Sequence, residues 1–242
     1  MTERLQGRIA VVTGAANGIG AGCAARFRAE GATVIGVDLA GADAACDLAD
    51  EEAVAALFAA IGAAHARIDV LLNAAAFATF AWLEEMTYAQ WRATLVGELD
   101  LTFLATRAAW PWLKASGTGG QGGASIINFA SANAAHALEG SPALAHCAGK
   151  GGVLAMTRQL AMEGAPHGIR ANTIAPGFIR TAATARHLAA DPGFESQVLA
   201  KNMLKRLGEP EDIAHAAVWL ASAEAGYVTA ANIPIDAGAT AW

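Results

Sequence analysis

The stretch Ile9-Ala-Val-Val-Thr-Gly-Ala-Ala-Asn-Gly-Ile-Gly20 decides the fold of this chain. It begins with a short apolar run that is typical of a buried parallel strand. Three glycines follow, and they allow the backbone to turn tightly and to approach a pyrophosphate closely: Gly14, Gly18 and Gly20. The amphipathic run 19–30 comes next, and the free N–H groups and positive dipole end of a helix favour an anion. The stretch therefore predicts a phosphate-binding loop between a strand and a helix.

A second apolar run, 33–38, ends in Asp38, about 20 residues beyond the glycines, where a ribose hydroxyl is expected. No Arg or Lys stands beside Asp38, and Asn17 in the glycine loop is also uncharged. A 2′-phosphate would meet a carboxylate and no cation. The sequence therefore favours NAD over NADP as the cofactor.

The composition narrows the class of protein. A chain of 242 residues with 55% hydrophobic content can bury one full core, so we expect a single domain. The net charge of -6 and the pI near 5.5 argue against nucleic acid as a partner. The N-terminus has no apolar core typical of a signal peptide, and no apolar stretch is long enough to span a bilayer. Three widely spaced cysteines favour neither a zinc site nor a disulfide framework, and a cytoplasmic location fits them best: Cys23, Cys46 and Cys147.

Short apolar runs alternate with longer segments of helical period, which is typical of repeated β-α-β units. The expected strands are 9–13, 33–37, 69–73, 124–130, 170–175 and 232–235, with a further short strand before Cys46. The expected helices are 18–30, 50–65, 88–114, 145–164 and 210–223, the last with Pro210 in its first turn, and 117–123 is expected to be a flexible connector. The fold class is therefore α/β, a single-domain Rossmann-type doubly wound parallel sheet with helices on both faces.

The segment 178–203 carries no strand pattern and lies where the carboxyl edge of the sheet opens, so we interpret it as a substrate lid. A plain surface excursion is the alternative. Several aromatic and histidine side chains near the same edge indicate an apolar pocket with a few polar contacts, although core packing explains the aromatics equally well: Phe77, Phe80, Trp82, His136, Phe178 and His187. The two histidines are too isolated to indicate a metal site.

With the glycine loop placed, further motifs occur in order over nearly the whole chain, and together they resemble the short-chain dehydrogenase/reductase superfamily. Asp47-Leu48 resembles the turn that touches adenine, and Asn73-Ala-Ala-Ala76 stands where the family has Asn-Asn-Ala-Gly. Ser125 to Ser131 resembles the strand that ends in the catalytic serine. The segment 169–181 resembles the Pro-Gly segment that holds the nicotinamide amide, and 235–238 resembles the C-terminal Val-Asp-Gly-Gly.

This resemblance implies a set of cofactor contacts and an assembly. The cofactor-binding residues are expected to be Gly14, Asn17, Gly18, Ile19, Gly20, Asp38, Asp47, Leu48, Asn73, Lys150, Pro176, Gly177, Ile179 and Thr181. The family also implies a homo-tetramer. Small residues along one helix and a tryptophan pair suggest a self-association face, with intrachain packing as the alternative: Gly149, Gly151, Gly152, Ala155, Trp110 and Trp112.

Two catalytic positions depart from the family pattern. The family places a Tyr four residues before the catalytic Lys, and His146 stands there in this chain, before Lys150. The only tyrosines, Tyr88 and Tyr227, are far away in the sequence. The supporting Asn of the central helix is replaced by Glu98.

A histidine can nevertheless serve as the base. A phenol has a pKa of about 10 and needs a lysine to lower it, whereas an imidazole near 6.5 is already competent around neutrality. His146 and Lys150 are four residues apart and share a helix face. Two positive charges about 5 Å apart repel by roughly 3 kcal/mol at an effective dielectric near 20, so His146 is expected to be neutral unless Glu98 compensates Lys150. A neutral imidazole accepts an alcohol proton, which favours alcohol oxidation.

The sequence thus predicts an NAD(H)-dependent oxidoreductase that interconverts a secondary alcohol, either a cyclic alcohol or a sugar-like polyol, and its ketone. His146 would be the proton acceptor, Ser131 would orient the substrate, Lys150 would hold the ribose, and Glu98 would support both. Two alternatives stay open, because an imidazole reaches roughly 2 Å less far than a phenol. One is a dinucleotide-binding protein without redox turnover, acting as a sensor or assembly subunit. The other is a non-redox lyase that uses the same pocket.

Overall fold

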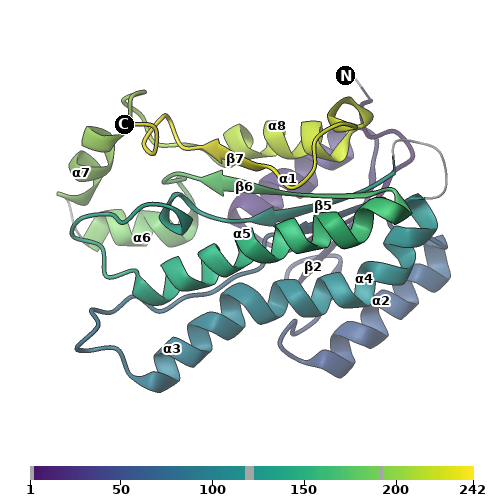
Figure 1. Cartoon of the computed structure of the whole chain (residues 1–242), viewed down its shortest axis with the longest axis horizontal. Helices are drawn as coiled ribbons and strands as arrows, with labels where there is room; N and C mark the ends of the chain where they lie inside the picture. The colour runs from purple at the N-terminus through teal and green to yellow at the C-terminus, as the bar shows by residue number, and fades with distance from the viewer. Residues whose placement is uncertain (1–2, 118–122, 191–192) are drawn as a thin grey trace.

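A computed structural model describes residues 3–117, 123–190 and 193–242, and its centre is one parallel sheet (Figure 1). The strand order is β3-β2-β1-β4-β5-β6-β7. The strands are β1 (Ile9–Thr13), β2 (Thr33–Asp38), β3 (Ala44–Ala45), β4 (Val70–Asn73), β5 (Ala124–Phe129), β6 (Ile169–Pro176) and β7 (Asn232–Ile235). Every neighbouring pair is parallel, so all carboxyl ends meet at one edge. The predicted strands are confirmed, including the short one before Cys46.

Helices cover both faces of the sheet, which confirms the predicted doubly wound single-domain α/β fold (Figure 1). The helices are α1 (Gly18–Ala29), α2 (Glu51–His65), α3 (Tyr88–Leu95), α4 (Leu101–Gly117), α5 (Leu144–Gly164), α6 (Ala182–Ala190), α7 (Phe194–Lys201) and α8 (Pro210–Ala221). Helices α1 and α8 pack together on one face, and α2, α4 and α5 lie on the other. Within the described ranges, no helix combines the length and the apolar character needed to cross a membrane.

The alternation of side chains along the strands builds two separate cores. Val12 of β1 contributes to the core under α1 and α8, while the adjacent Val11 contributes to the core under α2 and α4. Phe27 and Phe58 are fully buried and fill the two cores from α1 and α2. Because successive strand residues point to opposite faces, a sheet covered on both sides needs continuous apolar runs. The sequence has such runs in β1, β4 and β5.

The connection from β2 to β3 is unusually short for parallel strands. Such crossovers commonly take a dozen or more residues, but only 39–43 join these two strands. Asp43 stabilises the turn, since its Oδ2 accepts hydrogen bonds from the Gly36 amide at 2.6 Å and from Arg28 at 2.5 Å. Hydrogen bonds to the Asp43 carboxylate thus hold this short crossover in place, where parallel strands are usually joined by a helix.

Two predicted elements differ from the structure. The expected continuous helix over 88–114 is divided, because residues Val96–Asp100 form a π-helical turn between α3 and α4. The predicted lid, 178–203, contains the helices α6 and α7, which the sequence pattern did not indicate. Most of the predicted connector, residues 118–122, lies outside the described residues.

The tryptophan pair of the expected self-association face packs inside the chain. The ring of Trp112 packs against Gly62 of α2, where an added Cβ would lie about 2.0 Å from the indole. Trp110 also packs against the same core. These contacts favour the intrachain alternative for the tryptophan pair.

Replacing Gly62 by Ala is expected to destabilise the protein by about 1–3 kcal/mol, because a bulky indole cannot move aside at low cost. The matched control is Gly151→Ala in α5, where an added Cβ has no heavy atom closer than 3.9 Å. Alanine also favours a helix by up to about 1 kcal/mol relative to glycine. Thermal unfolding should therefore show a lowered Tm for Gly62→Ala and an unchanged or raised Tm for Gly151→Ala. Equal Tm values would contradict the proposed indole contact.

Candidate active site

A buried carboxylate joins the two polar side chains that α5 presents at the carboxyl edge of the sheet. Oε1 of Glu98 lies 2.7 Å from Nδ1 of His146, and Oε2 lies 2.6 Å from Nζ of Lys150. Lys150 also donates a hydrogen bond to the Phe129 carbonyl at 3.0 Å. Spacing four residues apart places His146 and Lys150 on one face of α5, as the sequence predicted.

The π-helical turn positions Glu98 for these contacts. The Leu101 amide bonds back to the Val96 carbonyl, five residues earlier, and the wider turn lies against α5. The helix α5 provides a glycine at the point of contact, because an added Cβ on Gly149 would lie 2.6 Å from Cβ of Glu98. Gly149 therefore lets the Glu98 side chain approach α5 closely.

Burial and charge act in opposite directions on Glu98, which is only 3% exposed. Burial alone raises the pKa of this carboxyl. The hydrogen bond to His146 and the nearby Lys150 cation outweigh burial, so the pKa of Glu98 lies below its ordinary value. A lowered carboxyl pKa contributes stability that is present above the pKa of the unfolded chain and is lost as pH falls through the folded value. Glu98 is thus an anion at neutral pH.

Ser131 stands at the end of β5 and caps the short turn that follows. Its Oγ accepts a hydrogen bond from the Asn133 amide at 3.1 Å, which leaves the hydroxyl hydrogen to act as a donor. His146 is partly exposed, and its ring lies 5.5 Å from the ring of Phe80 between centroids. The imidazole is therefore in contact with an aromatic side chain.

The glycine loop has the shape of an anion cradle. An added Cβ on Gly14 would lie 2.7 Å from the Ala75 amide, and one on Gly20 would lie 2.0 Å from the Gly14 carbonyl. Asn17, the residue before α1, makes no side-chain hydrogen bond to the helix. It therefore leaves the amides of the first helical turn, including that of Ile19, for another acceptor. Such amides suit a phosphate. The loop thus fits the pyrophosphate of a dinucleotide.

Of the two acids predicted near the cofactor, Asp38 contacts this loop. Asp38 accepts hydrogen bonds from the Ala16 amide at 3.0 Å and from the Leu39 amide at 2.8 Å. Asp47 is exposed and caps the Ala49 amide at 2.9 Å, while Leu48 is buried. Asp38 is therefore held at the edge of the glycine loop, where the sequence placed it.

The predicted nicotinamide segment approaches the glycine loop. The Gly177 amide binds the Ile235 carbonyl at 2.9 Å, and Ile179 is buried after Pro176-Gly177. A methyl carbon of Thr181 lies 3.4 Å from where a Cβ of Gly18 would be. Segments more than 150 residues apart in the sequence thus come into contact at the carboxyl edge.

Asn73 is predicted to contact the cofactor, and its amide nitrogen is used inside the protein. Its Nδ2 donates to Oδ1 of Asn128 at 2.8 Å and to Oγ1 of Thr106 at 3.1 Å, both buried. Thr13, which stands before Gly14, has an Oγ1 that accepts hydrogen bonds from the amides of Ala74 and Ala75 at 3.1 and 3.2 Å. Thr13 thus fixes the chain after β4 against the start of the glycine loop.

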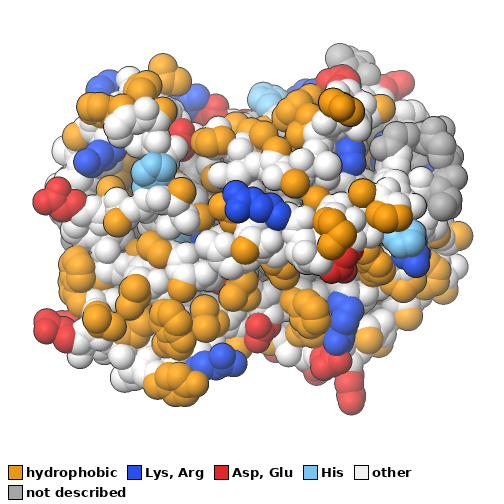
Figure 2. Space-filling view, viewed as in Figure 1, with side chains coloured by type: hydrophobic (Ala, Val, Ile, Leu, Met, Phe, Trp, Pro, Cys, Tyr) orange, Lys and Arg blue, Asp and Glu red, His pale blue; other side chains and the backbone are white. Residues whose placement is uncertain are grey.

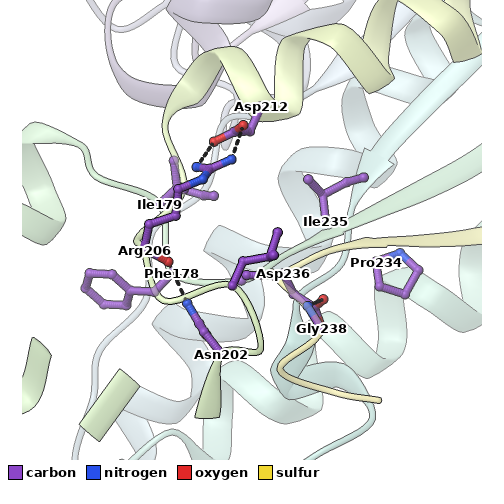
Figure 3. Close-up of a pocket in the computed structure, with 13 residues that line it drawn as sticks. Phe178, Ile179, Asn202, Arg206, Asp212, Pro234, Ile235, Asp236 and Gly238 are labelled. Atoms are coloured by element: carbon purple, nitrogen blue, oxygen red, sulfur yellow. Dashed lines mark hydrogen bonds and ion pairs between the residues drawn. The ribbon is translucent and has the colours of Figure 1, made fainter. Parts of the chain in front are cut away.

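A cavity of about 220 Å³ is lined in part by Gly177 of the Pro-Gly segment (Figure 3). Phe178 and Ile179 line it, and Arg206 reaches across to Asp212 of α8 with contacts of 2.7 and 2.8 Å. The hydrogen bond from Arg206 lowers the pKa of Asp212 to about 2. This pair holds the segment that follows the predicted lid against α8. His136 is exposed, and the side chain of His187 lies outside the described part of the structure.

Comparisons with known proteins agree with this geometry. A family model described as Enoyl-(Acyl carrier protein) reductase matches residues 14–240. The D-threitol dehydrogenase of Mycolicibacterium smegmatis is 38% identical over 255 residues, covering 98% of this chain and 94% of the relative. The 2,5-dichloro-2,5-cyclohexadiene-1,4-diol dehydrogenase LinX of Sphingobium indicum is 34% identical over 255 residues, covering 98% of each chain. A structure described as an NAD(P)-dependent gluconate 5-dehydrogenase from Beutenbergia cavernae, with NADP at low occupancy, has a TM-score of 0.89 and 31% identity and covers 100% of each chain.

The chain belongs to the short-chain dehydrogenase/reductase superfamily. It is an oxidoreductase, and the relatives named above are dehydrogenases of small alcohols.

Replacing Gly149 by Ala is expected to push Glu98 away from α5, because the added methyl would overlap its Cβ. Activity should fall by about tenfold or more, as the support of His146 and Lys150 is disturbed. Gly151→Ala, two residues along the same helix, should retain the parent's kcat and its pH profile. Steady-state oxidation rates of both variants test this, and loss of activity in both would contradict a specific role for Gly149.

Proposed function

We propose that this protein catalyses the NAD(H)-dependent interconversion of a secondary alcohol and its ketone, with His146 as the proton acceptor. The observation that carries the proposal is the bridge from Glu98 to both His146 and Lys150, at 2.7 and 2.6 Å. A dinucleotide-binding protein without turnover would have no need for a buried carboxylate at this position.

The bridge determines which nitrogen of His146 can accept a proton. A carboxylate anion accepts hydrogen bonds, so Nδ1 of His146 carries the hydrogen in this contact. Nε2 of the neutral ring then holds a lone pair and can act as the base. In the oxidative direction, Nε2 would take the proton of the alcohol. A nicotinamide cofactor, when bound, would supply the hydride acceptor that this chemistry requires.

Glu98 also balances the charges around that proton transfer. Without the carboxylate, the imidazolium formed on proton uptake would stand beside the Lys150 cation with no anion nearby. With it, each cation faces an oxygen of the same carboxylate. Removing one member of such a buried set is costly, since it leaves an uncompensated charge. Ser131 donates its hydroxyl hydrogen to the substrate oxygen, and Lys150 holds the nicotinamide ribose.

We propose NAD as the cofactor, bound along the glycine loop with Asp38 at the adenine ribose. Arg28, in the last turn of α1, is paired with Asp43 at 2.5 Å, so its charge is already balanced by a carboxylate. The similar gluconate 5-dehydrogenase structure contains NADP, so a direct test of the preference is needed. Relatives that act on a tetritol and on a ring diol support both substrate classes that the sequence suggested, polyols and cyclic alcohols. We place the enzyme in the cytoplasm as a homo-oligomer, with a tetramer as the family expectation.

Replacing Glu98 by Gln should lower kcat by about 10- to 100-fold. The neutral amide leaves the buried Lys150 cation without an anion, and it no longer balances the positive charge that forms on the base during proton uptake. Production of NADH from a panel of secondary alcohols between pH 5 and 9 measures this. His146→Ala should lose activity at every pH, and full kcat in that variant would show that another group is the base.

Replacing Asp38 by Asn removes the charge while keeping an oxygen that can accept from the Ala16 amide. The parent should use NAD better than NADP by at least about tenfold in kcat/KM, because a 2′-phosphate would meet the Asp38 carboxylate. The variant should reduce that ratio by about tenfold through better use of NADP. A parent enzyme that prefers NADP would contradict the cofactor assignment.

A further inference from the structure

The chain between β4 and α3 places an apolar surface beside the proposed base. Residues 74–83, which we call the aromatic loop, read Ala-Ala-Ala-Phe-Ala-Thr-Phe-Ala-Trp-Leu, and only the Thr79 hydroxyl and the Trp82 indole N–H among these side chains can form a hydrogen bond. Phe77, Phe80 and Trp82 are 52%, 54% and 51% exposed. Hydrophobic side chains gather at the lower left of Figure 2, where Figure 1 places α3 and the loop before it. Aromatic rings left half uncovered in one loop indicate a surface that is completed by a ligand.

The aromatic loop is fixed in position. The Thr79 amide donates to Oγ1 of the buried Thr94 in α3 at 3.0 Å. The backbone of Phe77 lies against Gly97 of the π-helical turn, where an added Cβ would be 2.2 Å from the Phe77 carbonyl oxygen. The start of the loop is tied to Thr13 by two amide hydrogen bonds. The apolar surface is therefore preformed and is attached to the same turn that carries Glu98.

Phe80 is the member of the loop that reaches the reaction centre. Its ring centroid lies 5.5 Å from that of His146, with 43° between the ring planes. Because Nδ1 of His146 is occupied by Glu98, an alcohol can deliver its proton only to Nε2. A substituent on the carbinol carbon then extends along the half-exposed phenyl ring of Phe80.

This surface discriminates between the two substrate classes. A polyol would place hydroxyl groups against phenyl and methyl groups that offer no hydrogen bond, and each such hydroxyl would lose its water partners. A ring or an alkyl chain instead gains from every apolar contact, by about fourfold in affinity for each buried methylene. Across the same sheet edge, Phe178 and Phe194 form an edge-to-face pair at 5.3 Å and add further apolar surface.

We propose that the substrate is a secondary alcohol whose carbinol carbon carries an apolar ring or chain, and that Phe80 determines this specificity. The inference rests on the proposed dehydrogenase function and selects one of its two substrate classes. Phe80 takes no part in proton transfer in this account. Its removal should therefore change the choice of substrate and leave the pH profile unaltered.

The test compares cyclohexanol and 1-phenylethanol with D-threitol and galactitol, with NAD, in the parent and in Phe80→Ala. The parent should favour the apolar alcohols by at least about 100-fold in kcat/KM. Phe80→Ala should lower kcat/KM for the apolar pair by about tenfold, chiefly through KM, with no loss for the polyols. Tyr227→Ala is the control, because Tyr227 is a fully exposed aromatic residue just before β7, at the opposite edge of the sheet. It should match the parent.

Several outcomes would overturn the inference. Better turnover of the polyols would reject the substrate class while leaving the dehydrogenase function intact, and an equal loss for both classes in Phe80→Ala would reject its role in specificity. A changed sedimentation mass with unchanged kinetics would show that the aromatic loop is a self-association surface. If neither class is oxidised although NAD binds, the proposed function fails separately. The ligand preference is then measured in the complex with NADH. Tryptophan fluorescence is followed while either cyclohexanone or a four-carbon ketose is added, and the concentrations that quench it are compared.

Discussion

One buried carboxylate holds the candidate active site together. Glu98 is almost inaccessible to water, and burial by itself disfavours its charge. Its charge persists because His146 and Lys150 face its two oxygens. The three side chains therefore depend on one another: the carboxylate needs its partners in order to remain ionised, and they need the carboxylate for position and compensation.

Space for that carboxylate comes from the backbone. The π-helical turn places Glu98 against α5, and Gly149 and Gly97 are the positions where a side chain would block the approach of the turn or of the aromatic loop. The same turn thus supports both the charged set and the apolar surface beside it. Adding one methyl group in this region is expected to lower the catalytic rate more strongly than it lowers the stability of the fold.

Much of the fold could be predicted from local patterns. The glycine loop, the strands and their parallel order follow from apolar runs, helical periods and the position of Asp38, which depend on nearby residues in the sequence. The π-helical turn could not be predicted in this way, because residues 88–114 keep a helical pattern and the break is made by contacts with α5 and the aromatic loop. The sequence of residues 178–203 does not indicate α6 or α7, so these two helices could not be predicted from it. The pairing of Arg206 with Asp212 is likewise a contact between elements.

The candidate site was predicted in part. Family spacing placed Ser131, His146 and Lys150 together, and the replacement of an Asn by Glu98 suggested a contact with Lys150. The second contact, from Glu98 to Nδ1 of His146, depends on side-chain direction across two helices, which spacing does not give. The motif at Asn73 likewise does not show that its amide nitrogen donates to Asn128 and Thr106, between β4, β5 and α4, and its role at the cofactor stays a prediction.

The most direct measurement of the central claim is the tautomeric state of His146. Nitrogen-15 NMR of histidine-labelled protein, with His146→Ala used to assign the signal, distinguishes a protonated from an unprotonated ring nitrogen. The account predicts that the neutral ring carries its hydrogen on Nδ1, hydrogen-bonded to Glu98, with Nε2 unprotonated. A ring that carries its hydrogen on Nε2 would contradict it. An Nδ1 signal that does not change when Glu98 is replaced by Gln would contradict it as well.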